Sequence, residues 1–177
     1  VAVSSDGDSA TVRYPGAGVL TMAELYFGDD PEFFKTGPAH LEWSRIGTEA
    51  IGMKEANWVL ADDPTDDEAV LAKVLWMPPG YRLFRHAHDW HRFETVIKGS
   101  LDVGDGKTLK AGDVSVSGPG QYYGPHVAGP EGALTLEIFE RQVAQYPDLE
   151  GEPQGEDAEM LAKAAKAIEE YKEQAAG

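Results

Sequence analysis

Residues 80–99 read GYRLFRHAHDWHRFETVIKG and contain three of the five histidines in the chain. His86 and His88 are two positions apart, so in an extended strand both side chains point to the same face of the sheet. Two imidazoles on one strand face are a frequent starting point for a metal site. The stretch therefore predicts a β-strand that carries two metal ligands.

Strands are predicted on both sides of this stretch. Residues 70–77 form a β-leaning apolar segment that ends at Pro78-Pro79-Gly80. Residues 101–107 predict a strand, a tight turn and a second strand, because Gly-Asp-Gly supplies positive φ angles at low cost. Residues 133–139 alternate, with Leu, Leu and Ile on one face and Thr, Glu and Phe on the other. A continuous β core is expected to about residue 140.

The spacing of glycines and histidines resembles the two short motifs of the cupin superfamily. The residues that carry the resemblance are Gly80, His86, His88, Gly99, Gly112, the turn Gly118-Pro119-Gly120, and His126. The resemblance spans roughly residues 70–140. It implies an all-β fold, the cupin double-stranded β-helix or jelly-roll barrel, with an N-terminal arm and a C-terminal α-helix.

One domain with three parts is expected: an arm over residues 1–40, the barrel over 41–145, and a linker with a helix over 146–177. The linker is rich in helix breakers, and apolar residues recur at three-to-four spacing in the tail. The predicted elements outside the motifs are strands at 10–14, 41–43 and 57–61, short helical segments at 21–27 and 31–35, and a helix at 157–175.

Composition excludes several functions. The chain has no cysteine, so a metal must bind nitrogen or oxygen ligands. The formal charge of −16 repels nucleic-acid phosphates and anionic lipid surfaces. No apolar run approaches the length of a membrane span. The first residues lack the basic head and apolar segment of a signal peptide, so we expect a cytoplasmic location.

His126 lies far along the chain from His86 and His88 and is the expected third metal ligand. The resemblance implies a glutamate as fourth ligand, but Arg92 occupies that position. His91 and Glu94 are the two substitutes, and the sequence leaves the choice between them open, together with a three-histidine site that uses neither. In an ideal strand, Glu94 points to the same face as His86 and His88. His91 is favoured because the spacing between these histidines and Gly99 matches the motif without an insertion. One divalent metal is expected, with Fe(II) favoured and Zn, Mn or Ni as alternatives.

Further candidates surround the histidines. Arg92 is expected to bind a substrate carboxylate or enolate, because a guanidinium can pair with two oxygens. Glu94 and Tyr123 are the expected proton-transferring groups, which with Arg92 complete the predicted catalytic set. Four aromatic residues are predicted to line the substrate pocket: Trp76, Tyr81, Trp90 and Tyr122.

These features predict a metal-dependent enzyme that acts on a small organic molecule. The resemblance implies Fe(II)-dependent dioxygenation as its commonest redox chemistry. Two alternatives are a non-redox isomerase, cyclase or lyase, and a module that binds a small molecule or metal without turnover. A homodimer is expected, with no nucleic-acid or membrane partner.

Overall fold

The computed structural model describes residues 2–6, 9–13, 26, 28–142 and 147–176. The chain divides into two compact units, Val1–Phe33 and Phe34–Gly177. In the first unit, strands β1 (Ala2–Asp6) and β2 (Ser9–Arg13) pair in antiparallel fashion. β2 corresponds to the strand predicted at 10–14, and the helix predicted at 21–27 lies outside the described residues.

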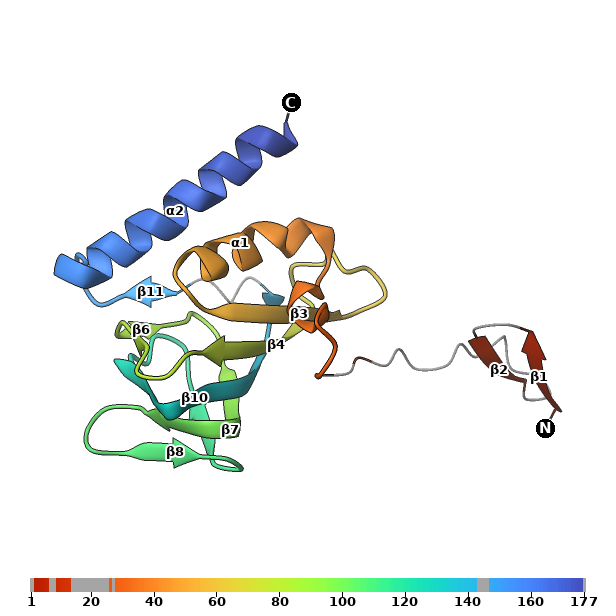
Figure 1. Ribbon diagram of the computed structural model, residues 1–177, viewed down its shortest axis with the longest axis horizontal. Helices are drawn as coiled ribbons and strands as arrows, with labels where there is room; N and C mark the ends of the chain where they lie inside the picture. The colour runs from red at the N-terminus through yellow and green to blue at the C-terminus, as the bar shows by residue number, and fades with distance from the viewer. Residues whose placement is uncertain (1, 7–8, 14–25, 27, 143–146, 177) are drawn as a thin grey trace. The chain divides into compact units, whose positions relative to one another are not determined.

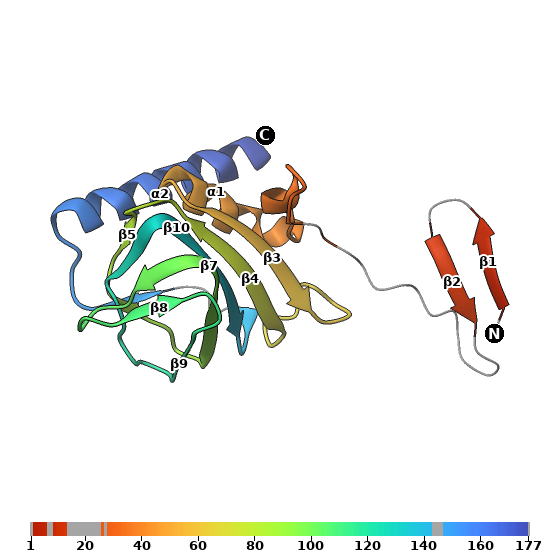
Figure 2. The same ribbon diagram turned by 60° about the horizontal axis from the view of Figure 1, so that its bottom comes forward.

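The second unit is built on one antiparallel sheet that curves into a barrel (Figures 1 and 2). Its central order is β3-β4-β10-β7-β8, and β5 pairs with β10 while β9 pairs with β7. The strands are β3 (Lys54–Leu60), β4 (Val70–Met77), β5 (Arg82–Leu83), β7 (Arg92–Asp102), β8 (Thr108–Lys110), β9 (Val114–Ser117) and β10 (His126–Phe139). The two-residue strand β6 (His86–Ala87) pairs with β11 (Asp148–Leu149).

The two faces of the long strands differ in chemistry. In β10, Thr135, Glu137 and Phe139 are buried and point into the barrel. The alternation predicted for residues 133–139 is therefore confirmed.

Where β7 passes β10, Gly99 adopts φ +79°, and a Cβ there would lie 2.0 Å from the carbonyl oxygen of Gly132. Only glycine permits this approach of the two backbones.

A helix replaces the strand predicted at residues 41–43. The 3-10 turns η1 (Phe33–Lys35) and η2 (Ala39–Leu41) lead into α1 (Glu42–Ala50). The prediction was wrong because the short window missed a three-to-four spacing of apolar residues that extends to Ile51. Ion pairs of Arg45 with Glu42 and with Glu49 also stabilise the helix.

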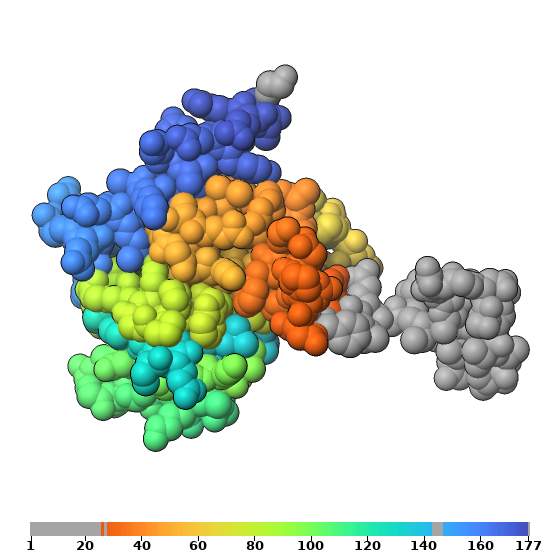
Figure 3. Space-filling model, viewed as in Figure 1, coloured from red at the N-terminus to blue at the C-terminus, as the bar shows by residue number. Residues whose placement is uncertain are grey.

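The C-terminal helix α2 (Gly155–Ala175) packs beside α1 on one side of the barrel (Figures 1 and 3). The approach is close at Gly47, where a Cβ would lie 2.8 Å from Cδ1 of Ile168. Three polar contacts hold the segment before and within α2 against the barrel: Arg85 to Glu150, Arg82 to Asp157, and Tyr122 to Asp148.

The predicted fold class is confirmed: an antiparallel jelly-roll barrel with a C-terminal α-helix. The structure has counterparts of the short helical segment predicted at 31–35, which is the 3-10 turn η1, and of the strand at 70–77, the hairpin at 101–107 and the terminal helix. Neither helix among the described residues combines the length and apolar character needed to cross a bilayer.

Candidate active site

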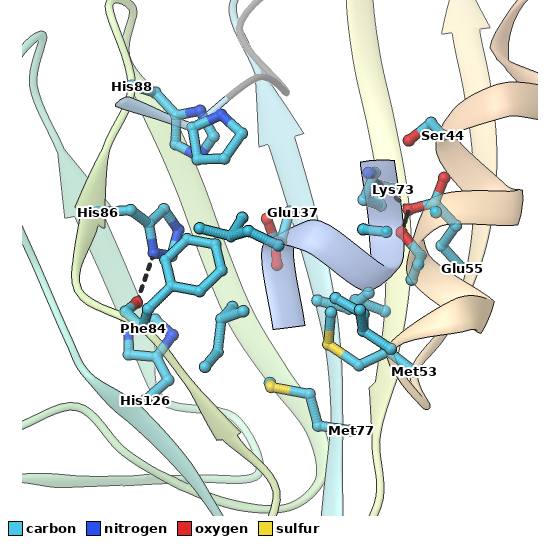
Figure 4. A pocket seen from close by; sticks show the side chains of 18 of the residues that line it. Ser44, Met53, Glu55, Lys73, Met77, Phe84, His86, His88, His126 and Glu137 are labelled. Carbon is cyan, nitrogen blue, oxygen red and sulfur yellow. Dashed lines mark hydrogen bonds and ion pairs between the residues drawn. The ribbon is translucent and has the colours of Figure 1, made fainter. Parts of the chain in front are cut away.

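A cavity of about 220 Å³ lies between the interior of the barrel and the helices α1 and α2 (Figure 4). The helices contribute mainly apolar side chains, among them Trp43, Leu161 and Ile168. The barrel strands contribute methionines, histidines and charged residues. The cavity therefore has a partly apolar wall and a strongly polar one.

His86, His88 and His126 all line this cavity and are nearly fully buried. His86 and His88 come from the short β6 region, and His126 begins β10. The ring centroids of His86 and His88 are 5.4 Å apart, and those of His86 and His126 are 6.1 Å apart. The structure thus brings the three predicted imidazoles to one wall, which Figure 4 shows.

Burial keeps two of these imidazoles neutral. Loss of hydration lowers the pKa of His86 to about 4, a shift that its hydrogen bond to the Phe84 carbonyl partly opposes. Burial, together with the charge of Arg92, lowers the pKa of His126 to about 3. His86 Nδ1 lies 2.9 Å from the Phe84 carbonyl oxygen. A carbonyl only accepts hydrogen bonds, so Nδ1 carries the proton and Nε2 keeps a lone pair.

The donors on this wall fit a divalent cation in their chemistry. Neutral imidazoles with fixed tautomers are the form that binds metals, and cysteine is absent from the chain. Their spacing is wider than one ion requires: within the described residues, no three His, Asp or Glu side chains are grouped closely enough to hold a metal as they stand. Binding an ion here therefore requires the rings to draw together.

A row of buried charged side chains runs across the inner face of the sheet from β3 to β7. We call it the charge belt, and its members are Glu55, Lys73, Glu137, Arg92 and Glu94. Lys73 Nζ lies 2.8 Å from Glu55 Oε2. Arg92 Nε lies 3.0 Å from Glu137 Oε2, and Arg92 Nη2 lies 2.9 Å from Glu94 Oε1. Strand register places Glu137 directly between Lys73 and Glu94.

The charge belt contains two cations and three carboxyl groups, so one carboxyl group has no cation of its own to balance its charge. Burial raises the pKa of Glu94 to about 7; the charge of Arg92 opposes this shift and that of Glu137 adds to it. Burial alone would raise the pKa of Glu137 too, but Arg92 and Lys73 lower it well below the ordinary range. The Glu94–Glu137 pair therefore takes up one proton as the pH falls through about 7, and it takes it up on Glu94, because Arg92 and Lys73 stabilise the charge of Glu137.

Tyr123 joins the histidines to the charge belt. Its ring stacks on His126 at a centroid distance of 5.3 Å, and the Arg92 guanidinium carbon lies 4.7 Å from the centre of the Tyr123 ring. The buried hydroxyl has no hydrogen-bond partner among the described residues. Burial raises the pKa of this phenol, so it is a proton donor rather than an anion at neutral pH.

The two candidates for a fourth metal ligand lie elsewhere. His91 is exposed, and its Nδ1 lies 3.0 Å from Glu140 Oε2. The structure therefore does not bring His91 to the other three histidines, because the turn after His88 directs it outward. Glu94 is buried but sits behind Arg92, and neither Glu94 nor Tyr123 is part of the cavity lining. Arg92 does line the cavity.

The four aromatic residues predicted for the substrate pocket do not line this cavity. Trp76 belongs to the outer face of β4, between the inward-facing Leu75 and Met77. Tyr81 donates to the sulfur of Met160, and the Arg141 guanidinium lies 4.1 Å from the Trp90 ring centre. Tyr122 hydrogen-bonds to Asp148 and to the Leu149 carbonyl. Aromatic content alone does not indicate which way a ring points.

Sequence reasoning missed three charged residues of the cavity wall: Glu137, Lys73 and Glu55. A signal for Glu137 was present, since the alternation of residues 133–139 puts it on the face of Thr135 and Phe139. No comparable signal marked Lys73 within an apolar strand. Its burial depends on Glu55, which Thr48 and Asn57 also hydrogen-bond.

We expect Glu94 to make stability fall as pH rises. The unfolded pKa is near 4.5 and the folded pKa is about 7, so the folded state keeps a proton that the unfolded state releases between these values. At about 1.4 kcal/mol per pKa unit, raising the pH through this window lowers the free energy of unfolding by about 3 kcal/mol. Glu94→Gln removes this loss, because an amide resembles the protonated carboxyl.

Urea unfolding of both proteins with chelator present, from acid to neutral pH, measures the effect. The histidine contributions are common to both and cancel in the difference. The stability of the Gln variant should rise relative to the wild type between pH 4.5 and 7. Parallel curves would show that Glu94 has an ordinary pKa.

No protein-family model matches the sequence, and no curated protein matches it. A search of solved structures returned proteins of cupin fold, in agreement with the barrel described above. An RmlC-like cupin from Shewanella frigidimarina is 24% identical, with a TM-score of 0.41, over 50% of this chain and 75% of that one.

Two other similar structures have different roles. One is a chain from the complex of Rhodobacter sphaeroides SigE with the anti-sigma ChrR, at 19% identity and TM-score 0.42, covering 50% of this chain and 44% of that chain. The other is Bacillus subtilis oxalate decarboxylase, an enzyme with Mn(II) centres, at 16% identity and TM-score 0.46, covering 56% and 28%. This chain thus spans less than half of either protein. Likeness at this level extends to the fold alone and carries no argument about activity.

Proposed function

We propose that this barrel is a metal-dependent enzyme that binds a small organic acid in its cavity and moves a proton on it. The observation that carries the proposal is the meeting of three buried histidines, a guanidinium and the Glu137 carboxyl at one wall of a cavity, with Glu94 on the neighbouring strand. Perturbed titratable groups gathered at a cavity are typical of active sites.

His86, His88 and His126 would hold the metal. When bound, a divalent ion there acts as a Lewis acid on a carbonyl or carboxylate oxygen of the substrate. The hydrogen bond from His86 Nδ1 to Phe84 orients one ring, and stacking on Tyr123 orients His126. These contacts support metal binding because they set the tautomer of His86 and the orientation of both rings, so that a shift of the rings toward one another is what binding an ion still requires.

Arg92 supports the choice of an acidic substrate. Its contacts with Glu137 and Glu94 use Nε and Nη2, which leaves the donors of Nη1 for a ligand oxygen. A cavity of about 220 Å³ admits only a small molecule. Met53, Leu75 and Met77 line the cavity and offer an apolar surface to the carbon skeleton.

The Glu94–Glu137 pair supports proton transfer. Glu137 lies at the cavity wall and keeps a negative charge, and the adjacent Glu94 titrates near neutral pH. Glu137 therefore presents a carboxylate that can accept a proton from the substrate. Groups that titrate near the working pH make effective general acids and bases.

The Glu137 carboxylate favours isomerase or lyase chemistry over the Fe(II)-dependent dioxygenation that the sequence resemblance implies. A carboxylate at the cavity wall can move hydrogen between atoms of a substrate, whereas dioxygenation has no evident need for it. Dioxygenation stays an alternative prediction, as does a module that binds a ligand without turnover.

One experiment separates the three functions. Chelator-treated protein is reloaded with Mn(II) or Fe(II) without oxygen and mixed in D₂O with a panel of small enolisable carboxylic acids. Proton NMR reads loss of the carbon-bound hydrogen, and an oxygen electrode reads oxygen uptake in a parallel aerobic sample.

We expect hydrogen–deuterium exchange without oxygen uptake in the wild type and in His91→Ala, whose altered side chain is exposed. Glu137→Gln should bind the same acids but lose the exchange. Oxygen consumption coupled to product would establish the dioxygenase instead. A rise in melting temperature with neither reaction would indicate a binding module.

A further inference from the structure

The outer face of the barrel sheet is unusually apolar. On β7 and β9, Phe93, Ile97, Val114 and Val116 point outward and are 37–65% exposed. On β10 their neighbours on the same face are also apolar, since Ile138 pairs with Phe93. We call the outer patch the set Phe93, Ile97, Val114, Val116, Leu134, Leu136 and Ile138.

The outer patch is too large to be incidental. Four large side chains exposed by about half leave on the order of 300 Å² of apolar surface, a size at which a patch on a monomer often marks an interaction site. Strand register makes the patch continuous, because Val116 pairs with Phe93 across β9 and β7. Most β-sheets with one solvent-facing side place polar residues there.

Charge indicates what covers this face. The chain carries 31 acidic residues and a formal charge of −16, so two copies repel each other across most of their surfaces. The part of the face that holds the outer patch contains no acidic residue. Its outward-facing residues are Phe93, Thr95, Ile97 and Lys98 of β7, Val114 and Val116 of β9, and Leu134, Leu136 and Ile138 of β10. The exposed acids of these strands, Asp102 and Glu131, lie toward the other end of β7 and β10.

We propose that the outer patch is the contact surface between two copies of this chain. Two such faces meet around a two-fold axis without placing an acid against an acid, and each apolar residue finds an apolar partner. An interface of standard size buries about 800 Å² per partner. The outer patch forms its apolar centre, and the surrounding residues, including Lys98, form its rim.

Sedimentation velocity of the full chain across a dilution series tests the proposal. We expect a dimer that dissociates on dilution for the wild type. Val116→Glu should shift the equilibrium to the monomer by at least about 100-fold in dissociation constant, because each dimer then buries two carboxylates. Val116→Thr keeps the β-branched shape and should weaken the dimer less.

Ala162→Glu is the matched control, since it adds the same group at an exposed position of α2 where glutamate suits a helix. It should leave the dimer intact. Circular dichroism confirms that Val116→Glu is folded, and Ile97→Glu supplies a second variant if it is not. A monomeric wild type, or a dimer that persists in folded Val116→Glu or Ile97→Glu, would overturn the proposal.

Discussion

Arg92→Met is expected to lower the free energy of unfolding by about 3–5 kcal/mol, the cost of removing one partner from a buried ion pair. Arg92 is 3% exposed and contacts both Glu137 and Glu94. Without it, Glu137 keeps a buried negative charge with only Lys73 nearby, and Tyr123 loses the cation over its ring. Urea denaturation with chelator present measures the loss.

A double variant tests whether the charge causes the effect. Arg92→Met combined with Glu137→Gln should be more stable than Arg92→Met alone, because the unpaired carboxylate is gone. Arg82→Met is the matched control: its ion pair with Asp157 is exposed and should be worth about 1 kcal/mol or less. If Arg92→Met and Arg82→Met cost the same, the charge belt is not a buried network.

His126→Ala is expected to weaken binding of a divalent metal by more than about 100-fold, since removing a ligand costs more than removing the group that orients one. His126 is 3% exposed and lines the cavity with His86 and His88. The two remaining imidazoles leave the ion one protein ligand short. Competition titration with a fluorescent chelator gives the dissociation constants.

His91→Ala is the control for this measurement, because His91 is exposed and pairs with Glu140. The account predicts wild-type affinity for it. An equal loss of affinity in His91→Ala and His126→Ala would place the fourth ligand at His91 and would require the turn after His88 to rearrange.

The fold could be predicted largely because strand patterns and turn residues are local signals. The apolar segment at 70–77 is a strand in the structure, and the Gly-Asp-Gly sequence after residue 103 is a turn. The helix at 42–50 was missed because the three residues 41–43 are too short a window to show its apolar spacing, and the ion pairs of Arg45 that stabilise it lie beyond that window. Short windows do not distinguish the two periods reliably.

The site could be predicted only in part. The resemblance of the histidine and glycine spacing to the cupin motifs was sufficient to predict that His86, His88 and His126 lie close together, and all three line one cavity. The partners of Arg92 could not be foreseen, because Glu137 reaches it through the pairing of β10 with β7. The role of α2 as a cavity wall depends on how the helix packs against α1, which its amphipathic pattern alone does not specify.

Anomalous diffraction from a crystal soaked in Mn(II) shows whether three buried imidazoles gather around one cation. We expect a single strong peak about 2.0–2.3 Å from one ring nitrogen each of His86, His88 and His126, with the ring centroids closer together than the 5.4 and 6.1 Å given above. No peak in the cavity, or a peak beside His91 and Glu140 instead, would contradict it.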